Sequence, residues 1–493
     1  MSTVASRKTA LIRRIVNQGA LMLAGFGGAQ VLGFLRNILL AHLITKGDFG
    51  TAAALTIALQ TFEMVSDVAV DRLILQADDN EDLRLMANGH SVLVIRALLM
   101  SLMLFAAAPL FAAAFSLVEA TTAFRAVALI PLLKGFMHLD CRRAQRRLDN
   151  RAAVLVEIIP QALALAAVWP AVRLTHDYTA ALWVTGVQAA ATAMVSHALA
   201  TTKYTLALDR QQLRRFLHFG WPILLSAIPL LAVFQGDRAI VARYQGVEAL
   251  AGYTVAFLVT MVPATLAVRI GTSLMLPLLA DNGGPKAALH ARRMERFTLM
   301  FEISVLAASL YLAGFLMLGG EVVRLAFGHN YAGYGSVTGA LALMWALRLL
   351  QAPFGALLMT AGDNRPFLIA GIVRAMALVP TLLAAYAGAD LAALGLCGAM
   401  GELAAIIYFA WWLRRDYAPL SRVVLSRTAF LGLTVCMTAP FWHGPWVGLP
   451  LPLAGALAAV IALFVVAAAA AIMPSTRGEL RLLRGSEKLA TAS

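Results

Sequence analysis

Runs of apolar residues long enough to cross a membrane follow one another along almost the whole chain. A membrane-spanning helix needs ~20 mostly apolar residues. The chain has 493 residues, of which 60% are hydrophobic and only 13% are charged. We therefore predict an all-α polytopic membrane protein with about fourteen transmembrane helices, since a helix satisfies its own backbone inside a bilayer. The predicted spans are 18–43, 48–74, 88–114, 119–140, 152–173, 178–200, 219–243, 249–280, 295–319, 333–360, 366–387, 390–413, 426–446 and 450–473.

The positive charges are concentrated in alternate loops between these spans. The formal net charge is +14, and basic stretches such as 141–151 and 203–218 fall on one side of the membrane. The loops on the other side contain Lys46, Arg173, Arg243 and Arg324. Because basic loops stay in the cytoplasm, both termini are predicted to be cytoplasmic, and 1–17 is read as a tail rather than a cleaved signal peptide. The positive charge follows from this topology and does not indicate nucleic-acid binding.

The sequence has no motif for a metal, a cofactor or a nucleotide. Cys141, Cys397 and Cys436 are scattered, without a CxxC pair or a run of histidines. The glycines of 23–33 follow no strand, and no Walker motif occurs, so direct use of ATP is not expected. We predict no cofactor.

Two segments in different halves of the chain resemble each other. The segment AVALIPLLKGFMHLDCRRAQRRLDNRAAVLV aligns without gaps with ALALMWALRLLQAPFGALLMTAGDNRPFLIA. In this alignment Lys134 falls on Arg348, and the Asp-Asn-Arg motif at 149–151 falls on the same motif at 363–365. Internal repeats of this kind are common in transporters.

A second pair of segments supports the repeat, since the segment from Arg36 resembles the segment from Arg238. Both offsets cover an even number of predicted spans, so the halves enter the membrane in the same direction. The predicted layout is a tail (1–17), a first six-helix lobe (18–200), a basic cytoplasmic linker (201–218), a second six-helix lobe (219–413), two additional helices (414–473) and a cytoplasmic tail (474–493). The linker is read either as a basic amphipathic helix on the inner surface or as an ordinary connector.

Several charged residues fall inside the predicted spans, where a charge is costly and usually functional. Lys134 and Arg348 lie near the middle of equivalent spans, so a cavity between the two lobes would receive one cation from each. A guanidinium or an ammonium group at such a place suits a phosphate or carboxylate. The predicted anion-binding residues are Lys134 and Arg348, with Arg96 and Arg374 as secondary cavity candidates, and the family resemblance given below adds Arg36 and Arg238. For any one of them, the alternative is a structural ion pair or a side chain that reaches the interface.

Glu63, Asp67 and Asp71 are spaced four residues apart and would share one face of the second predicted helix. One interpretation of Glu63 and Asp67 is a proton or sodium site that couples transport to an ion gradient. The other, which we favour, is pairing with arginines such as Arg36 on the first helix.

The stretch GFLRNILLAHLITKGDFGTAAALTIALQTFEMVSDVAVDRLILQ (33–76) resembles the N-terminal signature of Wzx-type oligosaccharide flippases of the MOP superfamily. The shared features are Arg36, an apolar run, and Asp48-Phe49-Gly50 at the start of the second helix. The basic loop AQRRLDNR also looks like the connector of that family.

This resemblance implies two six-helix lobes around a central cavity in the bacterial inner membrane. It implies that the protein flips undecaprenyl-diphosphate-linked oligosaccharide repeat units, destined for O-antigen, exopolysaccharide or capsule, by alternating access. The expected partners are this polyprenyl-diphosphate-linked oligosaccharide, the phospholipid bilayer, and the polysaccharide polymerase and chain-length machinery. By position, this resemblance also implies four anion-binding residues, which are Arg36, Lys134, Arg238 and Arg348.

Three other functions stay open on the sequence. A MurJ-like lipid II flippase shares the helix number and a cationic cavity, although the Asp48-Phe49-Gly50 turn argues against it. A MATE-type multidrug exporter shares the superfamily, but its cationic substrates favour acidic cavities. A membrane polysaccharide polymerase or ligase would be an enzyme, and the sequence shows no acid–base or nucleophile pattern that favours catalysis.

Overall fold

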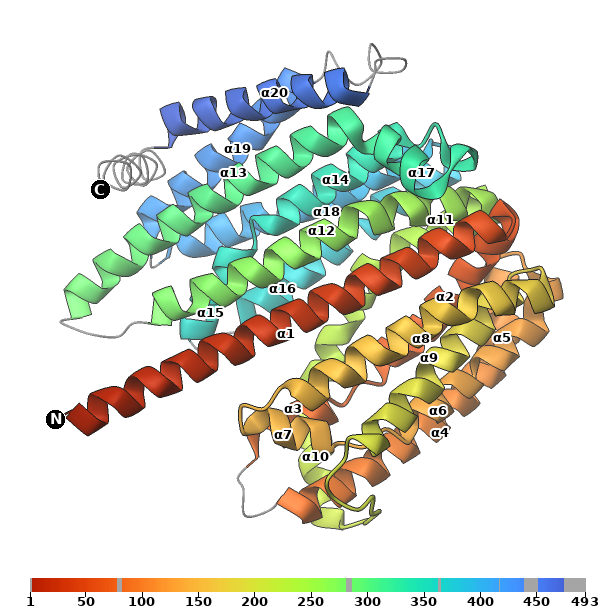
Figure 1. Cartoon of the computed structure of the whole chain (residues 1–493). Coiled ribbons are helices and arrows are strands. Elements are labelled where there is room, and N and C mark those ends of the chain that lie inside the picture. The colour runs from red at the N-terminus through yellow and green to blue at the C-terminus, as the bar shows by residue number, and fades with distance from the viewer. Residues whose placement is uncertain are drawn as a thin grey trace. The chain divides into compact units, whose positions relative to one another are not determined.

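The computed structural model describes residues 2–77, 82–280, 286–361, 365–415, 417–438 and 451–473, and its regular elements there are all helices. The predicted all-α fold is therefore confirmed (Figure 1). The chain forms two compact units, Met1–Thr254 and Val255–Ser493. The predicted C-terminal tail, 474–493, lies outside the described residues.

Unit 1 begins with a long helix that includes the predicted tail. Helix α1 starts at Ser2, although its apolar part, Asn17–Leu43, agrees with the first predicted span. The elements of unit 1 are α1 (Ser2–Leu43), α2 (Lys46–Val65), α3 (Val70–Gln76), α4 (Asp82–Ala114), η2 (Val118–Ala120), α5 (Thr121–Val127), α6 (Leu129–Gly135), α7 (Asp140–Arg146), α8 (Arg151–Thr175), α9 (Thr179–Ala198), α10 (Arg210–Leu231), the π-helical turn η3 (Ala232–Gly236) and α11 (Asp237–Gln245).

Helix α12 (Val247–Ala280) starts in unit 1 and continues into unit 2. The other elements of unit 2 are α13 (Lys286–Phe327), η4 (His329–Tyr331), α14 (Gly335–Leu349), α15 (Ala352–Ala361), α16 (Arg365–Ala375), α17 (Leu378–Tyr386), α18 (Leu391–Leu413), α19 (Ala418–Thr438) and α20 (Leu451–Ile472).

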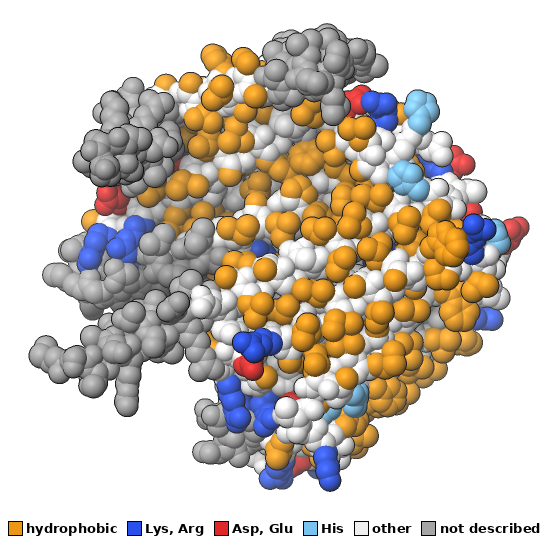
Figure 2. Space-filling model, in the orientation of Figure 1, with side chains coloured by type: hydrophobic (Ala, Val, Ile, Leu, Met, Phe, Trp, Pro, Cys, Tyr) orange, Lys and Arg blue, Asp and Glu red, His pale blue; other side chains and the backbone are white. Residues whose placement is uncertain are grey.

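Within the described residues, ten helices are long and apolar enough to cross a membrane, or twelve if each of two bent helix pairs counts as one span. The predicted spans 178–200 and 450–473 coincide with α9 and α20, which are not among these twelve. The count of fourteen therefore stays a prediction. Figure 2 shows apolar side chains spread over the visible face, with most of the visible Lys and Arg towards its edges.

The second predicted span, 48–74, is not one continuous helix. Helices α2 and α3 are bent by 42° where the chain breaks between them. Asp67 Oδ1 accepts a hydrogen bond from the Ala69 amide at 3.0 Å, and Ala69 has a left-handed backbone with φ of 52°. This local bond competes with the helical pattern, as Asp side chains often do. The prediction that Glu63, Asp67 and Asp71 share one helix face is therefore wrong.

The fourth predicted span, 119–140, is also interrupted, because α6 ends at Gly135 and α7 turns away by 52°. In unit 2, α14 ends at Leu349 and α15 starts at Ala352. Lys134 and Arg348 thus lie in the last turn of α6 and α14 and not in the middle of a continuous helix. A cation is favourable there, since the carbonyl end of a helix carries partial negative charge.

The compact units do not coincide with the predicted lobes, because 210–254 packs with the first six predicted helices. A Cβ atom built on Gly220 would lie 2.7 Å from the carbonyl oxygen of Val68, and one on Gly50 would lie 1.9 Å from that of Val247. Glycine is needed at both places because the backbones come too close for any side chain. The predicted lobe boundary therefore differs from the boundary that packing gives in this structure.

The linker 201–218 does not form a separate amphipathic helix. Residues 201–209 have no regular structure, and α10 starts at Arg210 with Asp209 as its N-cap. Residues 201–209 therefore form an ordinary connector, which was one of the two interpretations. We call this segment the connector below.

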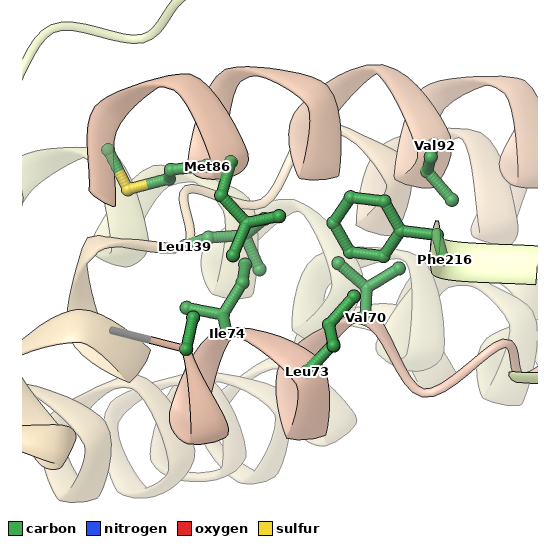
Figure 3. Close-up of a cluster of buried hydrophobic side chains, with 9 residues drawn as sticks. Val70, Leu73, Ile74, Met86, Val92, Leu139 and Phe216 are labelled. Atoms are coloured by element: carbon green, nitrogen blue, oxygen red, sulfur yellow. The ribbon is translucent and has the colours of Figure 1, made fainter. Parts of the chain in front are cut away.

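An apolar cluster holds the break between α6 and α7 against α3, α4 and α10. Figure 3 shows side chains of all these segments meeting around Ile74 and Leu139. The cluster contains Val70, Leu73, Ile74, Ala77, Leu85, Met86, Val92, Leu139 and Phe216. Burying such side chains stabilises the folded state by about 1.5–3 kcal/mol each. The cluster therefore fixes α3 and the α6–α7 break within unit 1.

We expect Gly50→Ala to destabilise the protein by roughly 1–3 kcal/mol, because the new methyl group forces the backbones of α2 and α12 apart. Thermal and denaturant unfolding of the purified protein in detergent measure this loss. Gly186→Ala in α9 is the matched control, since a Cβ there meets nothing within 4 Å. Equal stability of the two variants would contradict the close approach at Gly50.

Candidate functional site

The strongest charged cluster of unit 2 joins α14, α16 and α18 around one carboxylate. Glu402 is 1% exposed, while Arg348 and Arg374 are each 9% exposed. Arg348 Nε donates to Glu402 Oε1 at 2.8 Å, and Arg374 Nε lies 3.2 Å from Glu402 Oε2. Gln351, in the break after α14, donates to Glu402 Oε2 at 2.7 Å and accepts from Arg374 at 2.8 Å. The carboxylate, the amide and both guanidinium groups form one network.

Two guanidinium groups share one carboxylate in this cluster. Arg348 also lies over the ring of Trp345, with 4.7 Å between the guanidinium carbon and the ring centroid. Such a cation–π contact stabilises a desolvated cation by about 2 kcal/mol or more. The helix end, the ring and the carboxylate together explain how Arg348 is held in an apolar setting.

Unit 1 has a second charged cluster where α2 breaks. Lys134 Nζ lies 2.6 Å from Glu63 Oε1, with both side chains partly exposed. Arg96 on α4 donates to the Glu63 carbonyl at 2.9 Å and to Ser66 Oγ at 3.1 Å, and it lies 3.7 Å from Asp67. Arg96 therefore caps the carbonyl end of α2. The two cations and two carboxylates of this cluster balance one another.

Asp71 forms a separate pair on α3, with Arg142 Nη2 at 3.1 Å from its Oδ2. The favoured prediction that Glu63, Asp67 and Asp71 form ion pairs agrees with these contacts. The partner named for it, Arg36, is wrong, because Arg36 donates to Gln161 on α8 and Gln188 on α9.

Arg36 is held by two neutral amides. Its Nη1 donates to Gln188 on α9 and, at 3.5 Å, to Gln161 on α8. Amide oxygens can orient a guanidinium group, but they do not neutralise its charge. Arg36 thus presents a positive charge that its two amide partners do not neutralise, on a helix that packs along α8.

Arg238 lies in a polar network at the π-helical turn. It is 6% exposed, and its Nη2 donates to Gln235 at 2.7 Å. Gln235 in turn donates to Gln60 on α2 at 2.5 Å, and Asp237 accepts from the Tyr253 hydroxyl at 2.7 Å. Short π-helical turns often mark functional positions in helices.

The predicted site residues therefore lie in four different surroundings. Lys134 and Arg96 belong to a balanced cluster, Arg348 and Arg374 share one carboxylate, and Arg36 is bound by amides. Arg238 lies in its own network at the start of α11. Each unit holds its own residues, so the predicted convergence of the cations in one cavity stays a prediction.

The sequence missed Gln161, Gln188 and Gln351, which position the cations. One signal was present, since Gln188 and Glu402 are separated by 214 positions, the same offset as Lys134 and Arg348. The repeat thus places an amide in α9 where α18 has the carboxylate.

Comparison with solved structures defines the class of protein. The chain superposes on the lipid II flippase MurJ, in an inward closed conformation, with a TM-score of 0.67, 10% identity, and coverage of 92% of this chain and 98% of that chain. It also superposes on the inward-facing conformation of a multidrug resistance MATE family transporter of the MOP superfamily, with a TM-score of 0.63, 15% identity, and coverage of 80% and 96%. The fold is that of these MOP-type transporters.

Comparison with protein families is more specific. The model of the family described as "Polysaccharide biosynthesis protein" matches residues 39–335, more than half of the chain. The chain belongs to this polysaccharide biosynthesis family, so the resemblance found in the sequence is confirmed. The teichuronic acid biosynthesis protein TuaB of Bacillus subtilis (strain 168) is 20% identical over 302 residues, which cover 61% of this chain and 62% of that protein. The match thus spans less than two thirds of this relative.

We expect Glu402→Gln to lower the free energy of unfolding by roughly 3 kcal/mol or more, because it leaves two buried guanidinium groups without a counter-charge. Glutamine keeps the size of the side chain, so denaturant unfolding in detergent reports mainly the lost charge. The matched control is Glu321→Gln in α13, whose partner Arg324 is 47% exposed. Exposed pairs contribute about 0–1 kcal/mol, and a loss of that size for Glu402→Gln would contradict the role of the network.

Proposed function

We propose that this protein is a flippase that moves a lipid-linked oligosaccharide, an undecaprenyl-diphosphate-linked repeat unit, from the cytoplasmic to the outer leaflet of the bacterial inner membrane. Membership of the polysaccharide biosynthesis family and the MOP-type fold support this proposal. The observation that carries it is the placement of cations inside apolar helical units, at Arg36, which two amides hold, and at Arg348 and Arg374, which share one carboxylate. Cations are expensive there, and an anionic substrate group gives a reason to keep them.

The diphosphate is the part of the substrate that these cations suit. A guanidinium group binds phosphate through two parallel hydrogen bonds, which are stronger than bonds between neutral groups. Arg36 is the first candidate because amides orient it and leave its charge available. Arg348 and Arg374, which share the carboxylate of Glu402, would add attraction from the second lobe.

In the proposed mechanism, two lobes alternate between states open to either leaflet while the polar headgroup crosses near the predicted lobe interface. The lipid tail stays in the bilayer, so only the sugars and the diphosphate need a polar path. We also propose that both termini are cytoplasmic. The protein would cooperate with a polysaccharide polymerase and chain-length machinery. The activity is transport, and no bond of the substrate is formed or broken.

The charges disfavour export of cationic drugs. Such substrates need unpaired acids, but Glu63 and Glu402 are each paired with a cation. The likeness to a lipid II flippase concerns the fold alone, and it fits a substrate of the same chemical kind.

Deletion of the gene should cause complete lipid-linked repeat units to accumulate in the cytoplasmic leaflet, and wild-type protein should clear them. Arg36→Gln should slow this clearance by about tenfold or more, since a charge-assisted hydrogen bond contributes about 1.5–3 kcal/mol. The measurement is the fraction of lipid-linked oligosaccharide that an impermeant glycosidase reaches in spheroplasts.

The controls are Arg36→Lys, which keeps the charge, and Arg173→Gln, which removes a cation stacked on Trp169 at the end of α8. Both should clear the intermediate within about twofold of wild type when membrane levels match. If wild type clears nothing, the flippase function is wrong. If Arg36→Gln matches wild type, the function stands and the anion site is wrong.

Glu63 and Asp67 stay our candidates for ion coupling, because Glu63 holds Lys134 only while it is ionised. We expect transport in inverted vesicles to respond to an imposed pH gradient, and Glu63→Gln to remove this response while slow transport continues. A sodium gradient imposed without a pH gradient separates the two ions. An unchanged response of Glu63→Gln to both gradients would exclude Glu63 from coupling.

A further inference from the structure

Three histidine rings gather in unit 1, although they are far apart in the sequence. His90 comes from α4, His138 from the break between α6 and α7, and His197 from α9. The ring centroids are 4.8 Å apart for His90 and His138 and 5.3 Å apart for His138 and His197. Tyr204 of the connector stacks on His90 at 4.2 Å.

The hydrogen bonds of His90 show which of its two ring nitrogens carries the hydrogen. The backbone amide of Leu139 donates to His90 Nε2 at 3.1 Å, so this nitrogen carries no hydrogen. His90 Nδ1 lies 3.0 Å from the carbonyl oxygen of Thr205 and must therefore be the donor. The ring is neutral and bridges the α6–α7 break to the connector.

His138 repeats this arrangement with its nitrogens exchanged. The Asp140 amide donates to His138 Nδ1 at 3.1 Å, and His138 Nε2 donates to the Thr202 carbonyl at 3.1 Å. The backbone amide of His138 itself donates to Ser196 Oγ at 2.8 Å. This ring is also neutral, and it is 1% exposed as a residue.

The groups around the rings do not favour an added proton. Asp140 is the nearby acid, but its Oδ1 accepts from Arg143 Nε at 2.7 Å and its Oδ2 accepts from the Thr201 amide at 2.6 Å. His197 Nε2 lies 2.9 Å from the Phe136 carbonyl. Burial raises the pKa of Tyr204, so its phenol stays neutral and adds no negative charge.

We propose that His90 and His138 form a pH-sensitive latch, which holds the connector 201–209 against α4 and the α6–α7 break while both rings are neutral and releases it when they are protonated. Protonation would place a second N–H against the Leu139 amide or the Asp140 amide, so a hydrogen bond would become a clash of two donors. It would also place like charges beside Arg143 and one another.

The latch acts on a segment that leads directly into α10. The connector is bound further by the Ala207 amide, which donates to Ser91 Oγ at 3.0 Å, and by the Asp209 amide, which donates to Asn88 at 2.7 Å. Helix α10 packs at Gly220 against Val68, next to Asp67 in the charged break of α2. Release of the connector therefore frees the start of a helix that packs against Val68, the residue after the predicted coupling residue Asp67.

The direction of the pH dependence follows from linkage. Rings released into water titrate near pH 6.5, as histidine does in model peptides, whereas latched rings are held neutral by their donors. Protons therefore bind the released state better, so the latch holds above about pH 6.5 and weakens as the pH falls below it. The relevant pH is that of the predicted cytoplasmic side.

Hydrogen–deuterium exchange of the full-length protein in lipid nanodiscs at pH 7.5 and 5.5 tests the latch without using transport. The reporters are the amides of Thr201, Ala207 and Asp209, after correction for the intrinsic pH dependence of exchange. We expect their protection to fall by about tenfold or more at pH 5.5 in wild type. Peptides of α8 should keep their protection at both pH values.

His90→Gln and His138→Gln, alone and together, keep part of the hydrogen bonding but do not titrate. The double variant should show the same connector protection at both pH values, and each single variant a reduced fall. His42→Gln, at the exposed end of α1, is the control and should behave like wild type. Protection in wild type that does not depend on pH, or an equal fall in the double variant, would overturn the proposal. If the double variant loses α8 protection and is therefore misfolded, the two single variants decide.

Discussion

The cost of placing a charge in an apolar environment shapes this structure more than any other constraint. Each cation that the sequence predicts as a site residue has a hydrogen-bonding or ion-pair partner. Glu402 is almost completely buried and binds two guanidinium groups, whereas the more exposed Lys134 and Glu63 form a simple pair. Removing one member of a buried pair leaves the other uncompensated, which is why such clusters are expensive to alter.

Helix breaks provide the places where these charges lie. Lys134 lies in the last turn of α6, Arg348 in the last turn of α14, and Asp67 in the break after α2. A break frees backbone carbonyls and amides, and charged side chains satisfy them, as Arg96 does for the end of α2. The two repeats keep this pattern but balance it differently, since α9 has Gln188 where α18 has Glu402. The proposed interaction with a diphosphate rests on Arg36, which two amides hold, and on the two guanidinium groups that share Glu402.

Unit 1 also contains two neutral histidine rings that join separate segments of the chain. His90 and His138 each accept a backbone amide from the break after α6 and donate to a carbonyl of the connector. A ring with one donor and one acceptor can make such a bridge only while it is neutral. Because the apolar cluster around Leu139 lies beside it, the break and the connector depend on each other (Figure 3).

The sequence by itself determined the all-helical membrane architecture, the family and the charged residues worth attention, because apolar runs, loop charges and the repeat are local patterns. It also indicated that Glu63 and Asp67 would be paired. It did not indicate that Lys134 pairs with Glu63, that Gln188 holds Arg36, or that three histidines meet, since these residues are 71, 152 and up to 107 positions apart. Nor could it place the helix breaks, because a break depends on whether the tertiary structure offers partners for the freed backbone groups. Tertiary packing decided these contacts because each partner is selected by burial and distance, which the order of residues does not contain.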